Sequence, residues 1–165
     1  MASCGLLVRV ADAILLPFFA LIAIAAPLVD AQTVLPSSLF PEFLADLKSQ
    51  YATFSGDYLI AKKPPFFVGL VFYELIVQWP LSLANLYGLI ASKPWFRTTC
   101  LAYGVSASTS MAAILGELLL SGQSSDKLLM IYLPFLFVSL IAIVRGLAPC
   151  STIASTPVPA RKKRA

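Results

Sequence analysis

Long apolar runs, interrupted by one polar stretch, organise this chain. Four runs, at residues 6–29, 66–90, 96–120 and 128–148, have the length of membrane spans. A hydrocarbon core of about 30 Å needs about 20 helical residues. Backbone polar groups in lipid must be paired within a helix or a closed barrel, and four spans cannot close a barrel. The pattern therefore predicts an all-α, polytopic membrane bundle of four helices.

The connection between the first two runs, residues 31–65, is the one substantial polar region. Apolar residues recur within it at the i, i+3, i+4, i+7 spacing of an amphipathic helix. They are Phe40, Phe43, Leu44, Leu47, Tyr51 and Phe54. Ser37 or Ser38 is a candidate N-cap, with Pro41 in the first turn. We expect a short helix over the mouth of the bundle, which is either a functional lid or an ordinary interfacial helix.

Composition supports the membrane class and limits the chemistry. Of 165 residues, 59% are hydrophobic and only 12% are charged, whereas soluble domains average about 25% charged residues. The chain has no histidine, which excludes histidine metal sites and a Ser-His-Asp triad. Its three cysteines show neither metal-binding nor disulfide-framework spacing. We expect no cofactor and no metal, and no feature indicates nucleic-acid binding.

Basic residues predict the orientation, because Lys and Arg concentrate in cytoplasmic loops. The side that holds both termini carries eight of them: Arg9, Lys93, Arg97, Arg145, Arg161, Lys162, Lys163 and Arg164. The other side carries four: Lys48, Lys62, Lys63 and Lys127. We expect cytoplasmic termini, a membrane domain at 1–150 and a basic tail at 151–165. The 31–65 segment and the 121–127 turn then face the lumen or the exterior. A signal peptide cleaved after Ala31 competes, but the first apolar run exceeds the usual core of about 7–15 residues.

Glu74 is the most unusual residue of the sequence, because it lies inside an apolar span. An ionisable side chain there costs about 2.5 kcal/mol or more on insertion scales, so it needs a partner or a wet cavity. Asp30, at the end of the first run, reaches a similar depth if its side chain points inward. Gln78 lies one helical turn from Glu74 on the same face. These positions predict a polar site between the first two spans.

Two carboxyl groups in an apolar cavity do not readily ionise together, so we expect one proton to be held. We assign it to Glu74 and the charge to Asp30, which lies nearer to water. Such a pair suits a ligand that is a lipophilic cation or a hydroxylated lipid. A proton relay and a structural hydrogen bond between the two spans are the alternatives.

Three stretches, VDAQTVLPSSLFP, FYELIVQWP and PWFRTTCLAYGVSASTS, closely resemble the sigma-2 receptor family, also called the transmembrane protein 97 family. This family belongs to the wider group that shares the emopamil-binding-protein (EXPERA) domain. The resemblance covers nearly all four spans. It implies a four-helix protein of the endoplasmic reticulum, often a homodimer, which acts in sterol homeostasis or trafficking. Its lumenal-half cavity is then expected to bind sterols, including oxysterols, and cationic amphiphilic drugs.

The resemblance also implies roles for the acidic residues. Asp30 matches the family's amine-pairing aspartate, and Glu74 matches its protonated hydrogen-bonding partner. Gln78 matches the polar residue one turn from that glutamate. Asp57, in FSGDYLI, matches a lumenal acid that contacts the ligand or supports the site.

The remaining candidate binding residues come from the last two spans. Tyr103 and Tyr132 match aromatic wall positions of the family. Phe135 and Ser110 depart from the family pattern, because they stand where tyrosine and threonine are common. Both keep bulk or polarity, so they affect ligand selectivity more than the existence of the site.

Lys162 and Lys163 stand fourth and third from the end, the positions of a dilysine signal for retrieval to the endoplasmic reticulum. Two other functions stay open. One is a sterol Δ8–Δ7 isomerase, the activity of the emopamil-binding relatives, although those enzymes also rely on a histidine. The other is a trafficking adaptor for a cholesterol-transport membrane protein. We expect a binding protein rather than an enzyme.

Overall fold

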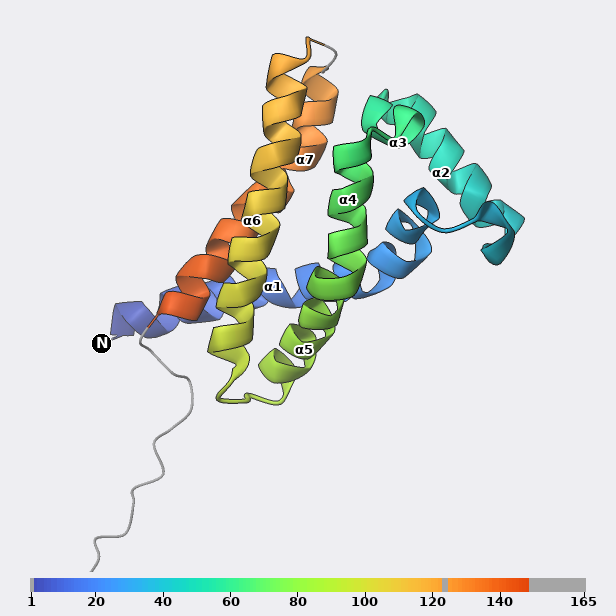
Figure 1. Cartoon of the computed structure of the whole chain (residues 1–165). Coiled ribbons are helices and arrows are strands. Elements are labelled where there is room, and N and C mark those ends of the chain that lie inside the picture. The colour runs from blue at the N-terminus through green and yellow to red at the C-terminus, as the bar shows by residue number, and fades with distance from the viewer. Residues whose placement is uncertain (1, 123–124, 149–165) are drawn as a thin grey trace, which may run out of the picture.

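The computed structural model describes residues 2–122 and 125–148, which form helices joined by short turns with no strand among them (Figure 1). Four helical segments of these residues are long and apolar enough to cross a membrane: Gly5–Thr33, Pro65–Ile90, Phe96–Leu120 and Asp126–Leu147. The prediction of an all-α, four-span bundle is confirmed. The proposed retrieval lysines Lys162 and Lys163, and the 151–165 tail, lie outside the described residues.

The last two spans, α6 (Phe96–Leu120) and α7 (Asp126–Leu147), form a closely packed antiparallel pair (Figure 1). Two glycines explain the close approach. A Cβ at Gly104 would lie 2.7 Å from the backbone N of Ile143, and one at Gly146 would lie 2.6 Å from the Cβ of Leu101. Small residues let membrane helices approach closely enough for dispersion forces to hold them. The pair therefore forms one continuous wall of the bundle.

The first span, α1 (Ala2–Leu28), packs against this wall and against the second span. Its N-terminal half is fixed by a salt bridge between Asp12 and Arg145 of α7, with 2.6 Å between Oδ1 and Nε. Arg145 is only 4% exposed, and its guanidinium also lies over the ring of Phe96, 5.1 Å from the centroid. This pair was missed in the sequence, where Arg145 served only to predict orientation.

The second span consists of α4 (Pro65–Tyr73), a π-helical turn (Glu74–Gln78) and α5 (Trp79–Ile90). Pro80 explains the irregular turn. Its backbone nitrogen carries no hydrogen and cannot donate a hydrogen bond, and in a regular α-helix its ring would crowd the carbonyl of Ile76, four residues earlier. A π turn is a common way to accommodate such a disruption, and such turns are frequent at functional sites. Here the turn carries Glu74 and Gln78.

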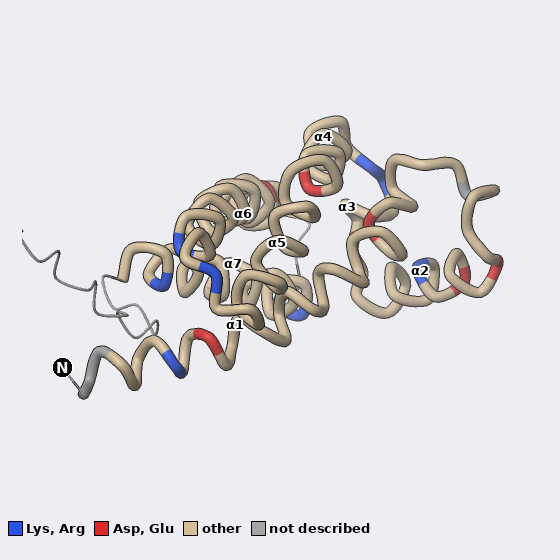
Figure 2. Tube along the Cα trace, turned by 90° about the horizontal axis from the view of Figure 1, so that it is seen from below, with Lys and Arg blue, Asp and Glu red and all other residues tan. Residues whose placement is uncertain are grey.

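The polar connection folds into the 3₁₀ turns Asp30–Thr33 and Ser37–Leu39, helix α2 (Glu42–Ser55) and helix α3 (Tyr58–Lys62). The predicted helix exists, but the serine cap was wrong. Helix α2 begins after Pro41, whose backbone is extended, and no side chain caps it. A residue before proline disfavours the helical conformation, so the helix cannot run from Ser38 through Phe40. Figure 2 shows α2 and α3 lying away from the N-terminal end of α1.

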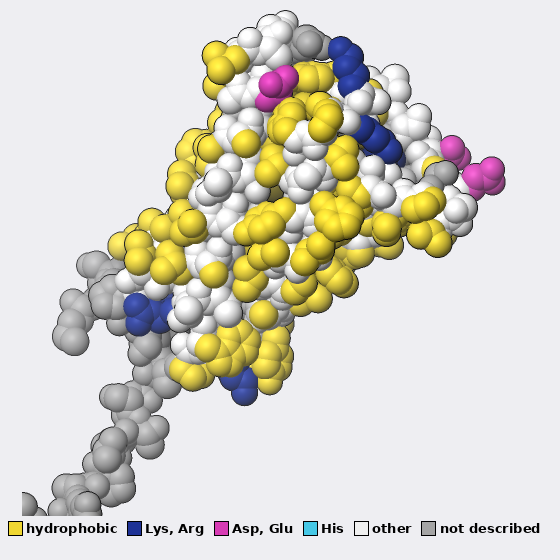
Figure 3. Space-filling model, in the orientation of Figure 1, with side chains coloured by type: hydrophobic (Ala, Val, Ile, Leu, Met, Phe, Trp, Pro, Cys, Tyr) yellow, Lys and Arg dark blue, Asp and Glu magenta, His cyan; other side chains and the backbone are white. Residues whose placement is uncertain are grey.

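The apolar residues of α2 do not form its inner face. Phe43, Leu47 and Phe54 are 67%, 54% and 71% exposed, respectively, and only Leu44 of the predicted stripe is buried. A membrane protein need not bury an apolar stripe against itself, because lipid is an apolar partner. Figure 3 shows the same principle on one face of the molecule, where apolar side chains cover the middle and charged ones lie towards the ends.

Candidate functional site

A cavity of about 320 Å³ lies between the spans, beneath the connection that carries α2. Its size is at the lower end of the range of about 300–1,000 Å³ for small-molecule sites. Its apolar wall consists of Leu21, Ile22, Ala25, Val29, Ile60, Phe67, Leu70, Val71, Met111, Ile114, Ile131 and Phe135. Its polar lining consists of Asp30, Thr33, Lys48, Tyr51, Glu74, Gln78, Ser110 and Tyr132. An apolar container with a few polar groups is suited to an amphiphilic ligand.

Asp30 and Glu74 both line this cavity, although 44 positions separate them in the sequence. Asp30 begins the 3₁₀ turn that ends the first span, and Glu74 begins the π turn of the second. No hydrogen bond joins the two carboxyl groups among the described residues, although both line the same space. The direct bond expected of a purely structural tie is therefore not found. Both groups remain available to a molecule in the cavity.

Gln78 and Ser110 connect the π turn to α6. The buried side-chain amide of Gln78 donates a hydrogen bond to the hydroxyl of Ser110, with 3.0 Å between Nε2 and Oγ. Both residues also line the cavity. Glu74 and Gln78 begin and end the same π turn, and this bond holds the turn against α6. The position of Glu74 therefore depends on the third span as well as on its own helix.

Lys48 is the charged cavity residue that sequence analysis missed as a site residue. It lies four positions after Leu44 and three before Tyr51, so these three residues share one helical face of α2. The ammonium of Lys48 donates to the hydroxyl of Thr33, with 2.7 Å between Nζ and Oγ1. Burial and then repulsion by Lys63 lower the pKa of Lys48 to about 8, and attraction to Asp30 opposes this shift. Its spacing from Leu44 and Tyr51 in the sequence could have indicated this position, because it places a cation on the inner face of α2.

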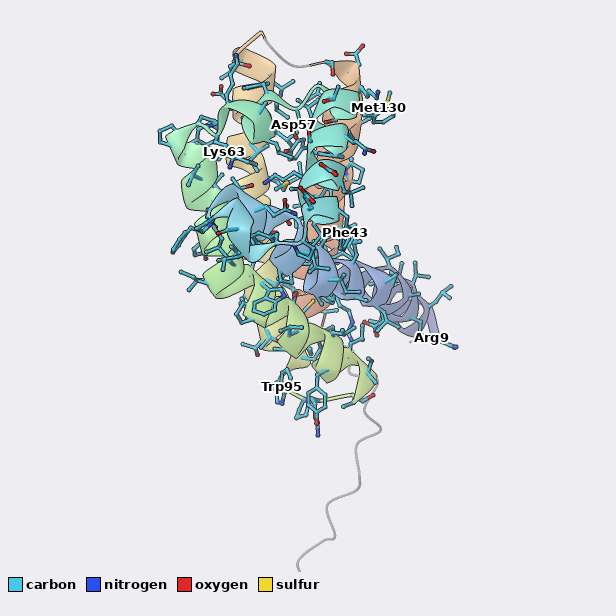
Figure 4. All side chains as sticks on the ribbon, turned by 90° about the vertical axis from the view of Figure 1, so that its right-hand side faces the viewer. Arg9, Phe43, Asp57, Lys63, Trp95 and Met130 are labelled. Carbon is cyan, nitrogen blue, oxygen red and sulfur yellow. The ribbon has the colours of Figure 1, made fainter. Side chains whose placement is uncertain are left out.

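Asp57 lies at the turn between α2 and α3, as Figure 4 shows, and is fully buried. It is the N-cap of α3, where its Oδ1 accepts hydrogen bonds from the backbone N of Leu59 at 3.0 Å and Ile60 at 3.3 Å. Its Oδ2 accepts a bond from the hydroxyl of Tyr132 at 2.8 Å. Asp57 is not part of the cavity lining, whereas Tyr132 is. The geometry thus matches support of the site, one of the two roles that the family resemblance implied.

The two remaining aromatic candidates lie in different places. Phe135 lines the cavity. Tyr103 is 2% exposed and lies outside the lining of this cavity. Its ring packs edge-on against Phe19 and Phe18, with centroid distances of 5.1 and 6.1 Å. These rings bury Tyr103 in the core beside the cavity, so its contribution is to packing.

Contacts across the bundle hold α2 and α3 over the cavity. The hydroxyl of Tyr58 donates to the carboxylate of Glu117 on α6 at 3.2 Å. The ammonium of Lys127 on α7 donates to the backbone oxygen of Phe54 at 2.7 Å. Both bonds attach the connection to the end of the bundle where α6 and α7 are joined. We call the segment from Val34 to Lys63, which follows the first span, the roof of the cavity.

Comparison with known proteins agrees with this architecture. Residues 43–146 match the family model EXPERA (EXPanded EBP superfamily). The chain is 32% identical to Sigma intracellular receptor 2 of Xenopus tropicalis, in an alignment that covers 71% of this chain and 76% of that protein. It is 28% identical to the Homo sapiens protein of the same name, with 70% and 75% covered. The resemblance stated from the sequence motifs is confirmed, and the chain belongs to the EXPERA family.

Proposed function

We propose that this protein is an intracellular membrane receptor that binds a sterol, including oxysterols, or a cationic amphiphile in the cavity beneath the roof. One observation carries the proposal: Asp30 and Glu74 face a largely apolar cavity between membrane spans. The similar proteins are named as receptors, which supports the receptor class. Localisation in the endoplasmic reticulum, cytoplasmic termini, homodimerisation and a role in sterol homeostasis or trafficking are parts of the same proposal.

Different parts of the cavity would supply the affinity for a ligand and determine its orientation. Its apolar wall would remove a ring system from water, at roughly 25 cal/mol per Å² before the costs of association. The polar end would then orient the ligand. In its protonated form Glu74 donates a hydrogen bond to a ligand oxygen, and the Asp30 carboxylate accepts one from a hydroxyl or an ammonium.

Replacing Asp30 by Asn tests the proposal, because the amide has nearly the same shape without the charge. We expect Asp30→Asn to lower affinity for an amine-bearing sterol at least tenfold, since a charge-assisted bond is about twice as strong as a neutral one. Asp46→Asn, on the exposed side of α2, is the matched control. Binding would be measured by scintillation proximity with purified full-length protein. Undiminished amine binding in Asp30→Asn would contradict this role of Asp30.

Lipids that copurify with the protein address the ligand class directly. Mass spectrometry of extracts from the wild type and from Asp30→Asn should find sterols enriched only with the wild type. Equal sterol content in the two preparations would place sterol elsewhere on the membrane-facing surface.

We propose that the protein binds its ligand and does not convert it. The alternative is sterol isomerisation, which the resemblance implies as the activity of the emopamil-binding relatives in the EXPERA superfamily. Isomerisation of a sterol double bond needs one group that donates a proton and another that removes one. The acid pair supplies such groups, but the chain has no histidine, on which the isomerases rely. Incubation of the purified protein with a Δ8-sterol should give no Δ7 product, and product formation that Glu74→Gln abolishes would establish the enzyme instead.

A further inference from the structure

The cavity carries a cation of its own. Lys48 is the only basic residue among the described residues that line it, and it shares the lining with Asp30 and Glu74. It comes from the roof, whereas both acids come from the ends or turns of membrane spans. The lysine therefore reaches the polar end of the cavity from the roof and shares it with the groups that would receive a ligand.

Its contacts place the ammonium beside Asp30. The hydroxyl that accepts a bond from Lys48 belongs to Thr33, in the same 3₁₀ turn as Asp30. Lys48 and Asp30 attract each other electrostatically, although no salt bridge closes between them among the described residues. An ammonium has three N–H donors, and Thr33 accepts one of them. Lys48 is thus near enough to balance the charge of Asp30 and is not locked to it.

This arrangement changes the charge that a ligand meets. With Asp30 ionised and Glu74 neutral, the two acids contribute one negative charge, which the Lys48 ammonium balances. A ligand ammonium would then enter beside a like charge in a cavity of low polarity, where like charges disfavour each other strongly. A hydroxyl brings no charge, and its oxygen can accept one of the remaining ammonium donors.

We propose that Lys48 is a tethered cation that sets the specificity of the cavity, occupying Asp30 in the empty protein and favouring neutral, hydroxyl-bearing sterols over amines. The inference rests on the proposed function and narrows it to one ligand class. An amine binds only after Lys48 loses its proton or its flexible four-carbon stem swings away. The titratable groups that face Lys48 from the roof and the spans are Asp30, Tyr51, Lys63, Glu74 and Tyr132.

A matched pair of ligands isolates the effect of charge. Cholesterol and its 3β-amino analogue differ only in the group that would reach the polar end. Lys48→Met removes the charge while keeping a long apolar side chain. Lys93→Met, in the turn between the second and third spans at the other end of the bundle, removes the same charge far from the cavity.

We expect Lys48→Met to raise affinity for the aminosterol at least tenfold and to change affinity for cholesterol less than threefold. Lys93→Met should leave both affinities within threefold of the wild type. Binding of both sterols with an unchanged amine-to-hydroxyl affinity ratio in Lys48→Met would overturn the proposal and leave the proposed function standing. Failure of every variant to bind either sterol would overturn both.

A measurement without ligand tests the pairing separately. Reductive ¹³C-methylation labels lysine amines for NMR, and Lys48→Met identifies the resonance of Lys48. Because Asp30 favours the charged ammonium, Asp30→Asn should lower the titration midpoint of Lys48, whereas Asp46→Asn should not. An unmoved midpoint in Asp30→Asn would overturn the pairing even if sterols bind.

Discussion

Charged residues lie close together at both ends of this bundle, but among the described residues they form a salt bridge at only one of the two ends. At the end near the termini, Arg145 donates from Nε and Nη2 to the two oxygens of Asp12, at 2.6 and 3.2 Å. At the cavity end, Asp30, Glu74 and Lys48 face one space without a salt bridge among these three side chains. A closed pair satisfies its own charges and holds helices together. An open cluster leaves hydrogen-bonding capacity for another molecule, which is the requirement of a binding site.

The largest predicted effect breaks the closed pair. Asp12→Asn leaves the buried guanidinium of Arg145 without its carboxylate, and breaking a buried pair from one side costs about 3–5 kcal/mol. We expect a correspondingly lower midpoint of thermal unfolding in detergent, measured by tryptophan fluorescence. Asp46→Asn, which removes an exposed carboxylate from α2, should change the midpoint little.

The double variant Asp12→Leu/Arg145→Met makes that prediction specific. Well-packed apolar residues often replace a buried ion pair at no loss of stability, so the double variant should recover most of the loss seen in Asp12→Asn. Equal instability of the two variants would show that the residues act through shape rather than through their charges.

A smaller effect is expected where a buried acid supports the cavity without lining it. Asp57→Ala removes the cap of α3 and leaves the Tyr132 hydroxyl without its acceptor, at a combined cost of about 2–3 kcal/mol. Tyr132→Phe removes only one bond and should cost about 1 kcal/mol. Chemical denaturation would rank the two variants. A larger loss for Tyr132→Phe would contradict the capping role of Asp57.

The contrast between the two ends also explains what the sequence could predict. Hydropathy and length were sufficient for the four spans, because lipid imposes one solution on an apolar run. Glu74 predicted a candidate site because its cost in a span demands a compensating environment. The Asp12–Arg145 pair joins residues 133 positions apart, and no local pattern records which helices meet.

The roof shows a second limit of prediction. An apolar stripe on a soluble helix indicates its buried face, whereas on α2 Phe43 and Phe54 are exposed and Lys48 faces inward. The hydrophobic pattern could not distinguish the lipid-facing side from the protein-facing side, since both are apolar environments. Lys48 was therefore interpreted as a marker of orientation rather than as part of the site. Tyr103 shows the same limit, because an aromatic ring can line a cavity or pack beside it.

The remaining prediction is that the open cluster responds to pH. The pKa of Lys48, about 8, is lower than that of an ordinary aliphatic amine at about 10. Between pH 7 and pH 9 Lys48 therefore loses its proton while an aminosterol keeps its charge. Aminosterol affinity should rise by up to about tenfold over this range, about 1.4 kcal/mol, because repulsion by Lys48 disappears.

The pH profile of the Lys48→Met variant separates this mechanism from titration of the acids. The variant should lack the rise in aminosterol affinity between pH 7 and pH 9, whereas Lys93→Met should retain it. Cholesterol carries no charge and should show at most a small fall as Lys48 loses one N–H donor. A rise for the aminosterol that persists in Lys48→Met would assign the titration to Glu74 or Asp30, since ionisation of either acid also attracts a cation. The cavity would then be an acidic site that attracts cations, and Lys48 would have no effect on its preference for ligand charge.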